Sequence, residues 1–168
     1  MSEELSPAMP ADIEAAVARV LERACAREMK IATAESCTGG LLSSLLTDVE
    51  GCSHAFDRGF VVYSDQAKCD LLHIPRSTVE RFGAVSREVA VAMAQGALNA
   101  SEADIALSIT GFAGRGGNGD EPGLVHFACA RDGADAVHRE AHFGDIGRGP
   151  VRIECIRTAL DMIEKALS

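Results

Sequence analysis

The sequence predicts one α/β domain, a three-layer α/β/α sandwich on a mixed, mostly parallel sheet. Short β-prone runs alternate with segments whose apolar residues recur at helical spacing, the pattern of strands connected by helical crossovers. Two further β-prone runs follow one another directly, which adds a hairpin and makes the sheet mixed. A length of 168 residues fits one domain with a sizeable core, and no repeat or linker divides it. We therefore expect a single domain over residues 1–168, with residues 1–10 as a flexible N-terminus.

In the first half of the chain, helices are expected to flank two strands. Pro10 begins a helical pattern that ends near Met29, because apolar residues recur there at three- and four-residue spacing. The valine-rich run at residues 60–63 predicts the core of a buried strand. The elements expected after the first helix are a strand at 30–34, a helix at about 40–48, a strand at 55–64, a short helix at 65–72 and another after Ser77.

In the second half, Ser86 is the expected N-cap of a long helix, because it precedes a run with apolar residues at helical spacing. Residues 104–110 form a continuous strand signal, and a glycine-rich loop follows at 111–123. The elements expected after this loop are adjacent strands at 124–131 and 136–143, joined by an Asp-Gly-Ala turn, and a closing helix from about 149 to 166.

Composition excludes several classes of protein. The net charge of −9 argues against nucleic acid as a partner, because binding a phosphate backbone needs a basic surface. No apolar run approaches the roughly 20 residues that span a bilayer, and the N-terminus lacks the features of a signal peptide. We therefore expect a cytoplasmic protein with no membrane partner. The six cysteines and five histidines do not cluster at metal-ligand spacing, so we expect no metal and no cofactor.

The segment at residues 31–40 (IATAESCTGG) carries the strongest indication of chemistry. A hydroxyl at a strand–helix junction can act as a nucleophile, and backbone amides gathered at the helix start can hold an anion. The structural alternative is that Ser36 or Thr38 is only the N-cap of the helix. Ser36, Tyr63 and Thr110 each lie at the carboxyl end of an expected strand, so we expect them to converge on one crevice.

Lys68 is the candidate general base for Ser36, since no histidine stands in a triad context. Burial at a helix start would lower the pKa of this lysine toward neutrality. Tyr63, at the neighbouring strand end, can relay a proton or hold the lysine by a hydrogen bond. The alternatives are a solvated surface charge for Lys68 and a core residue with a satisfied hydroxyl for Tyr63.

Two further groups complete the expected crevice. The backbone amides of residues 37–40 are expected to point into it and to stabilise an oxyanion. Cys37 competes with Ser36 as a nucleophile, although we favour the interpretation that it is an apolar filler. Arg148 and Arg152, at the start of the last helix, can hold a phosphate or else are ordinary solvated arginines.

Five sequence blocks, in order, resemble the CinA C-terminal-domain family over about residues 11–167. They are AESCTGG (34–40), GFVVYSDQAK (59–68), GAVS (83–86), SITGFAG (108–114) and VRxxxIxxAL (151–160). The enzymatic members of this family are nicotinamide-nucleotide amidases. The resemblance implies deamidation of nicotinamide mononucleotide to nicotinate mononucleotide and ammonia. It also implies a stand-alone domain that forms homodimers.

The resemblance assigns roles by position. Ser36 resembles the acyl nucleophile, Lys68 its general base, and Tyr63 the third member of that constellation. The residues expected to line the oxyanion and amide site are Thr38, Gly39 and Gly40. The residues expected to border the nucleotide are Ser86, Thr110, Gly111, Ala113 and Gly114, with Arg148 as the substrate-binding arginine of the last segment.

Two departures from the family pattern concern the nucleotide site. Arg115 stands where the glycine loop of the family usually has proline, which would loosen the loop or add a phosphate contact. The Gly-Asp-Arg block of the family reads GDIGR at residues 144–148, two residues longer. The altered loop keeps a second hypothesis open, a non-catalytic pyridine-nucleotide-binding or regulatory module of the same fold. A third is hydrolysis of another small amide, because the pocket walls set the substrate.

Overall fold

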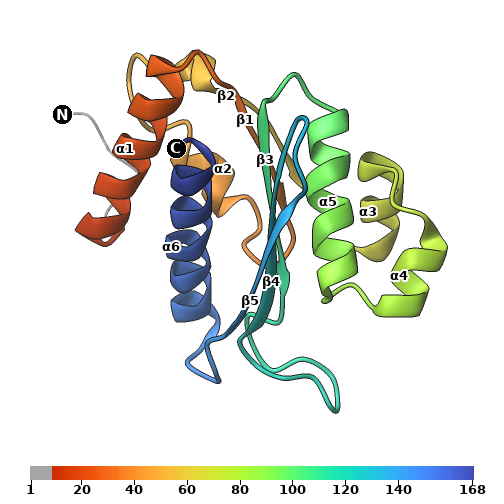
Figure 1. Cartoon of the computed structure of the whole chain (residues 1–168). Coiled ribbons are helices and arrows are strands. Elements are labelled where there is room, and N and C mark those ends of the chain that lie inside the picture. The colour runs from red at the N-terminus through yellow and green to blue at the C-terminus, as the bar shows by residue number, and fades with distance from the viewer. Residues whose placement is uncertain (1–8) are drawn as a thin grey trace.

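The structure, a computed structural model, describes residues 9–168 (Figure 1). Residues 1–8, most of the expected flexible N-terminus, lie outside the described residues. Within the described range no helix combines the length and apolar character that crossing a membrane requires. The helices are α1 (Ala11–Ala26), α2 (Leu41–Leu45), α3 (Asp65–Leu72), α4 (Arg76–Phe82), α5 (Arg87–Asn99) and α6 (Arg148–Ala166), with a 3-10 turn at Ser53–Ala55. The strands are β1 (Ile31–Glu35), β2 (Phe56–Val61), β3 (Ile105–Gly111), β4 (Leu124–Arg131) and β5 (Val137–His142).

The strands form one sheet in the order β2-β1-β3-β4-β5. β1 lies between β2 and β3 and is parallel to both, whereas the pairs β3–β4 and β4–β5 are antiparallel. Only β4 therefore runs against the other strands of the sheet. The predicted mixed, mostly parallel sheet is confirmed.

Helices cover both faces of this sheet (Figure 1). α1, α2 and α6 pack on one face, and α3, α4 and α5 pack on the other. Successive strand residues alternate between the two layers, so Ile31 joins the core under α1 and α6 while Ala32 joins the core under α5. The predicted three-layer α/β/α sandwich is confirmed.

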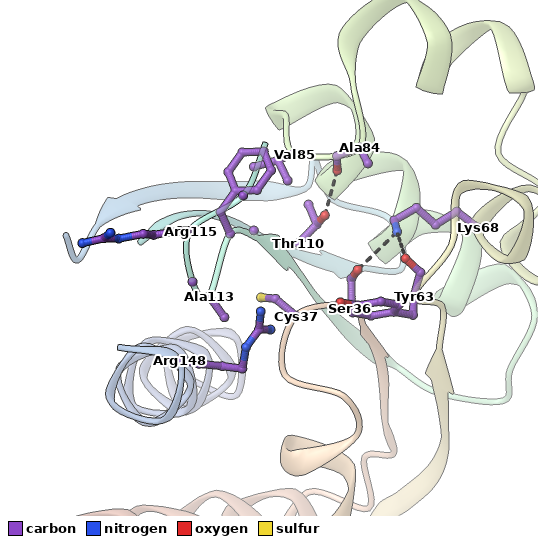
Figure 2. Close-up of a pocket in the computed structure, with 14 residues that line it drawn as sticks. Ser36, Cys37, Tyr63, Lys68, Ala84, Val85, Thr110, Ala113, Arg115 and Arg148 are labelled. Atoms are coloured by element: carbon purple, nitrogen blue, oxygen red, sulfur yellow. Dashed lines mark hydrogen bonds between the residues drawn. The ribbon is translucent and has the colours of Figure 1, made fainter. Parts of the chain in front are cut away.

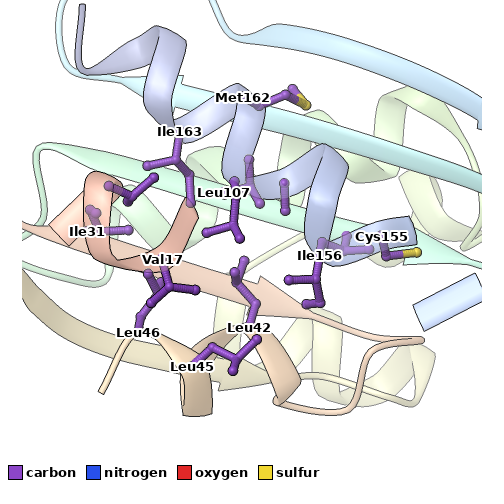
Figure 3. Packing of buried hydrophobic residues seen from close by; sticks show 14 of the residues in the cluster. Val17, Ile31, Leu42, Leu45, Leu46, Leu107, Cys155, Ile156, Met162 and Ile163 are labelled. Atoms are coloured by element: carbon purple, nitrogen blue, oxygen red, sulfur yellow. The ribbon is translucent and has the colours of Figure 1, made fainter. Parts of the chain in front are cut away.

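The larger core lies between the sheet and α6 (Figure 3). Ile156 and Ile163 of α6 are fully buried in a cluster that includes Ile31 of β1 and Leu107 of β3. Burial of such side chains holds α6 firmly on the sheet. Its first residue, Arg148, is thereby placed beside the carboxyl ends of the parallel strands.

The expectation of a buried strand at residues 55–64 is wrong. β2 is shorter, and it lies at the edge of the sheet, where it pairs with β1 alone. The side chain of Val61 is half exposed as a result. A valine-rich run favours a strand, but it does not say whether a second strand covers the outer edge.

The N-cap alternative for Ser36 and Thr38 is also wrong. The N-cap of α2 is Gly40, whose φ of 96° lies in the left-handed region that favours glycine. α2 is shorter than the helix expected at 40–48, because the amides of Thr47 and Asp48 donate three residues back, at 3.1 and 3.2 Å, instead of four. Ser36 and Thr38 thus lie in the connection between β1 and α2.

Candidate active site

The candidate active site is a pocket of about 380 Å³ at the carboxyl ends of β1 and β3 (Figure 2). Parallel strands end at the same edge of a sheet, which brings the segments that follow them together. The lining comes from the β1–α2 connection, the segment from β2 into α3, the turn before α5, the loop after β3 and the start of α6. The lining residues are Ser36, Cys37, Tyr63, Lys68, Ala84, Val85, Thr110, Gly111, Phe112, Ala113, Gly114, Arg115, Gly116 and Arg148.

Ser36 directly follows β1, and its amide extends the pairing with β3 by donating to the Ile109 carbonyl at 3.0 Å. Side chains alternate between the faces of a strand, so Glu35 points to the α2 layer. Ser36 then points to the other layer, toward α3. The side chain of Ser36 is buried at the base of the pocket.

Lys68 reaches Ser36 from the first turn of α3. The Ser64 hydroxyl caps this helix by accepting a hydrogen bond from the Ala67 amide at 3.0 Å. The Lys68 side chain is only 1% exposed, and its Nζ lies 3.2 Å from Ser36 Oγ. Figure 2 shows the two side chains pointing toward one another. The structure thus brings together the two residues expected to be nucleophile and base.

The amine of Lys68 has two further partners, the carbonyl oxygens of Val62 at 2.9 Å and Tyr63 at 3.5 Å. A neutral amine has two hydrogens and one lone pair. When both hydrogens are donated to carbonyls, which only accept, the lone pair faces the Ser36 hydroxyl. Burial lowers the pKa of Lys68 from its ordinary value of 10.5, against an opposing effect of the nearby Asp65 carboxylate. This environment favours the neutral amine that a general base needs.

Tyr63 lies beside this pair but contacts it differently from the expectation. Its carbonyl oxygen, and not its hydroxyl, accepts the hydrogen bond from Lys68. Its side chain lines the pocket and is 69% exposed, so the interpretation as a core residue is wrong. An exposed aromatic ring at the pocket mouth is available to a ligand.

Cys37 occupies the opposite side of the pocket from Lys68, next to Ala113 and Arg148 (Figure 2). It belongs to the larger apolar core, and its side chain is 4% exposed. A hydrogen bond with the Cys155 thiol lowers the pKa of Cys37. The hydroxyl that Lys68 Nζ contacts belongs to Ser36, which favours the serine over Cys37 as the candidate nucleophile.

The residues expected to line the oxyanion and amide site, Thr38, Gly39 and Gly40, are not among the pocket-lining residues. The Thr38 hydroxyl donates to Glu35 Oε2 at 2.6 Å, and the Gly40 amide donates to the same oxygen at 3.2 Å. The Gly39 amide donates to the Ser36 carbonyl at 3.1 Å. The expectation that all amides of residues 37–40 point into the crevice is therefore wrong for Gly39 and Gly40.

Most of the residues expected to border a nucleotide do line the pocket. Thr110, Gly111, Ala113 and Gly114 lie along its wall. The Thr110 hydroxyl donates to the Ala84 carbonyl at 2.7 Å, which ties β3 to the turn before α5.

Ser86 lies outside the pocket lining. Its hydroxyl accepts from the Val89 amide at 3.2 Å and donates to the Gly83 carbonyl at 2.8 Å. The prediction that Ser86 caps α5 is confirmed. The Ser86 hydroxyl is engaged in these two hydrogen bonds.

A model of one known family covers almost all of this fold and site. The family model for the CinA C-terminal domain matches residues 13–167. The chain belongs to the CinA C-terminal domain family. The crystal structure of the competence/damage inducible protein CihA from Agrobacterium tumefaciens superposes on this CinA domain with a TM-score of 0.91 and 43% sequence identity, covering 96% of this chain and 99% of that chain.

Relatives of this CinA domain differ in length. The nicotinamide-nucleotide amidohydrolase PncC of Enterobacter agglomerans is 44% identical over 137 residues, which are 77% of this chain and 82% of that protein. A CinA-like protein of Syntrophomonas wolfei is 46% identical over 140 residues, which are 82% of this chain but 33% of that protein. The chain spans about a quarter to a third of the length of several such relatives.

Three arginines in or near the pocket of the CinA domain have different environments. Arg148 lines the pocket, and its guanidinium lies 3.4 Å from the place where a Cβ on Gly114 would be. Arg115 also borders the pocket, but its Nε donates to Asp145 at 2.9 Å and ties the glycine loop to the segment before α6. Arg152 is not a lining residue; its Nε donates to the Cys37 carbonyl at 2.8 Å. Of the two arginines expected to hold a phosphate, the structure places only Arg148 in the pocket.

Sequence reasoning missed three features of the CinA domain site. Glu35 is a fully buried carboxylate directly before Ser36, and Val85 and Phe112 form apolar parts of the pocket wall. The alternation of side chains along β1 could have indicated that Glu35 points away from Ser36, into the layer of the following helix. Nothing in the sequence indicates which apolar residues of a turn face a pocket.

Proposed function

We propose that this protein is an amidohydrolase that converts nicotinamide mononucleotide to nicotinate mononucleotide and ammonia through an acyl-enzyme on Ser36. The observation that carries the proposal is the 3.2 Å contact between the buried amine of Lys68 and Ser36 Oγ in a pocket. Support also comes from the relative named nicotinamide-nucleotide amidohydrolase, which is 44% identical.

In the first half of the reaction, neutral Lys68 removes the proton from Ser36 as the serine oxygen attacks the carboxamide carbon. The new C–O bond gives a tetrahedral intermediate with a negatively charged oxygen. The ammonium of Lys68 then gives its proton to the amide nitrogen, the C–N bond breaks, and ammonia leaves. An ester between Ser36 and the nicotinoyl group remains.

In the second half, Lys68 takes a proton from water as the water oxygen attacks the ester carbon. The second tetrahedral intermediate collapses, the C–O bond to Ser36 breaks, and Lys68 returns the proton to the serine oxygen. The resulting carboxylic acid gives its proton to the solvent and leaves as a carboxylate. The carbonyls of Val62 and Tyr63 hold the Lys68 amine in one position through both halves.

Two kinds of group are candidates for holding the substrate. Of the amides expected to stabilise the oxyanion, those of Cys37 and Thr38 remain, since the Gly39 and Gly40 amides are directed to Ser36 and Glu35. The guanidinium of Arg148 at the other side of the pocket is suited to a phosphate.

The test is ammonia release from nicotinamide mononucleotide, nicotinamide riboside and nicotinamide. We expect turnover of the mononucleotide, and much less of the two compounds that lack a phosphate. Ser36→Ala should abolish release, and Lys68→Met should lower kcat by about 10²–10⁴-fold, the usual effect of removing a general base.

Cys37→Ala separates the two possible nucleophiles. We expect it to lose far less activity than Ser36→Ala, because Lys68 contacts the serine. Turnover retained in Ser36→Ala and lost in Cys37→Ala would make the cysteine the nucleophile. Calorimetric binding of the mononucleotide with no ammonia over hours would favour the non-catalytic module instead.

A further inference from the structure

We infer that Glu35 is a positioning residue, whose buried carboxylate fixes the backbone that holds Ser36 against Lys68. The inference rests on the proposed function, since it assigns Ser36 and Lys68 the roles given above. Neither the expected site nor the proposed mechanism uses Glu35, although it is fully buried and directly precedes the nucleophile.

The carboxylate of Glu35 collects the donors of the connection that follows it. Its Oε1 accepts from the amide and the hydroxyl of Ser43, both at 2.7 Å. Its Oε2 accepts from the Thr38 hydroxyl at 2.6 Å and from the amides of Gly40 at 3.2 Å and Leu42 at 3.1 Å. All five donors lie within eight residues of Glu35, so one side chain closes the whole turn from β1 into α2.

These contacts use both oxygens of the Glu35 carboxyl group as acceptors. Three of the donors are backbone amides, which cannot accept a hydrogen bond, and they are shared between both oxygens. Hydrogen bonds from neutral donors to a charged oxygen are stronger than bonds between neutral groups. A glutamine of the same shape would place an NH₂ group against at least one backbone amide.

The backbone of Glu35 connects both members of the Ser36–Lys68 pair. The Glu35 carbonyl accepts from the Val62 amide at 2.8 Å, and the Val62 carbonyl accepts from Lys68 Nζ at 2.9 Å. Ser36 is the next residue along the chain. A shift at position 35 therefore changes the position of Ser36 relative to the anchor of Lys68.

The surrounding strands leave room for this arrangement. Thr33 Oγ1 lies 2.6 Å from Ser43 Oγ, and extends the polar cluster by one residue of β1. A Cβ on Gly59 of β2 would lie 2.2 Å from Ser43 Oγ and 2.8 Å from Thr33 Oγ1. Only glycine at position 59 lets the Ser43 hydroxyl reach Glu35 without displacement.

The first test compares Glu35→Gln and Glu35→Asp with the wild type. We expect Glu35→Gln to lower kcat by about 10²-fold, the effect of misplacing reacting groups by about 1 Å. KM should change much less, because Arg148 and the loop after β3, which border the proposed nucleotide site, are not bonded to Glu35. Glu35→Asp keeps the charge and should recover part of kcat.

A second pair of variants tests the inference even if Glu35→Gln does not fold. Ser43→Ala and Thr33→Val both remove the Thr33–Ser43 hydrogen bond, but only Ser43→Ala also removes a bond to Glu35. We expect a several-fold loss of kcat in Ser43→Ala and none in Thr33→Val. Equal kcat values in these two variants, after circular dichroism has shown that both are folded, would overturn the inference.

Labelling of Ser36 by a fluorophosphonate, followed by intact mass spectrometry, separates this inference from the proposed substrate. A wild type that is labelled but releases no ammonia from the mononucleotide contradicts only the proposed function. Slower labelling of Ser43→Ala than of Thr33→Val supports the positioning role in either case. Equal labelling rates, or no labelling of the wild type, contradict the positioning role.

Discussion

The amine of Lys68 is buried in surroundings that disfavour its charged form. A lysine is rarely buried to this extent, because removing an ammonium ion from water costs free energy. Here the partners of the amine are two carbonyl oxygens and one hydroxyl, and among residues 9–168 no carboxylate is hydrogen-bonded to it. A bonded carboxylate would favour the charged form and oppose its use as a base.

We predict that this environment makes the stability of the protein depend on pH. Burial lowers the pKa of Lys68 in the folded protein below its ordinary value of 10.5. Between the pKa of the folded state and 10.5, the unfolded chain therefore binds more protons than the folded one. The free energy of unfolding should therefore rise with pH across this window, by at most about 1.4 kcal/mol per pH unit.

Urea denaturation of the wild type and of Lys68→Met at several pH values measures this effect. The wild type should gain stability relative to the variant as the pH rises toward 10.5. Parallel curves for the two proteins would show that Lys68 titrates equally in both states. The rate of ammonia release should rise over the same window, because the neutral amine is the active form.

The residues of the site show which contacts a sequence can predict. Ser36 and Lys68 were predicted from residue type and from their places after expected strands, and the structure brings them within 3.2 Å of one another. The partners of Glu35 could not be predicted, because they depend on the turn geometry of the connection into α2. The contact of Tyr63 through its carbonyl was missed since side-chain chemistry says nothing of main-chain acceptors.

The hairpin of β4 and β5 places titratable side chains on one of its faces. His126 pairs in register with Thr110 on one side and with Glu140 on the other. Its Nδ1 lies 3.0 Å from Nε2 of His138, with the two rings stacked. One ring must donate and the other accept, so protonating both would place two donors against each other.

We predict that the histidines of this hairpin titrate on opposite sides of the ordinary value of 6.5. Burial lowers the pKa of His126 and of His138, whereas hydrogen bonds to Glu121 and Glu140 raise the pKa of His142. A pH titration of the ring proton resonances by nuclear magnetic resonance checks this order. Glu121→Gln should lower the midpoint of His142 and leave that of His126 in place; a His126 midpoint above 6.5 would contradict the prediction.

The order of the helices and strands was predicted better than which strands pair with one another and where a helix ends. The periodicity of apolar residues gave the helices and strands in the correct order, and Ser86 was identified as the cap of α5. Whether a strand lies at an edge depends on which other strands pair with it, and this is why β2 was expected to be buried. The short α2 ends in a tighter turn, whose backbone hydrogen bonds span three residues, and its apolar pattern does not show this turn.

The site draws on both helical layers of the molecule. Lys68 comes from α3 on one face, while Arg148 belongs to α6 and the Glu35 side chain is bonded to α2 on the other (Figure 1). Packing that holds these layers on the sheet therefore also sets the width of the pocket. Ile156, fully buried between α6 and the sheet, is one such contact (Figure 3).

We predict that Ile156→Ala lowers the free energy of unfolding by about 2–5 kcal/mol, because it leaves a cavity under α6. Chemical denaturation measures the change. Val137→Ala, at an exposed position of β5, is the matched control and should change stability by less than about 0.5 kcal/mol. A similar loss in both variants would show that the contact under α6 contributes little.

α6 begins with Arg148 at the pocket and contains 19 residues, which at 1.5 Å per residue separate its two ends by about 28 Å. Ser168 lies two residues beyond the end of this helix and thus far from the pocket mouth. An affinity tag or a surface tether attached behind Ser168 should leave the mouth open to solution. Immobilised protein can therefore be flushed with successive nucleotides, and the ammonia in the effluent can be measured for each.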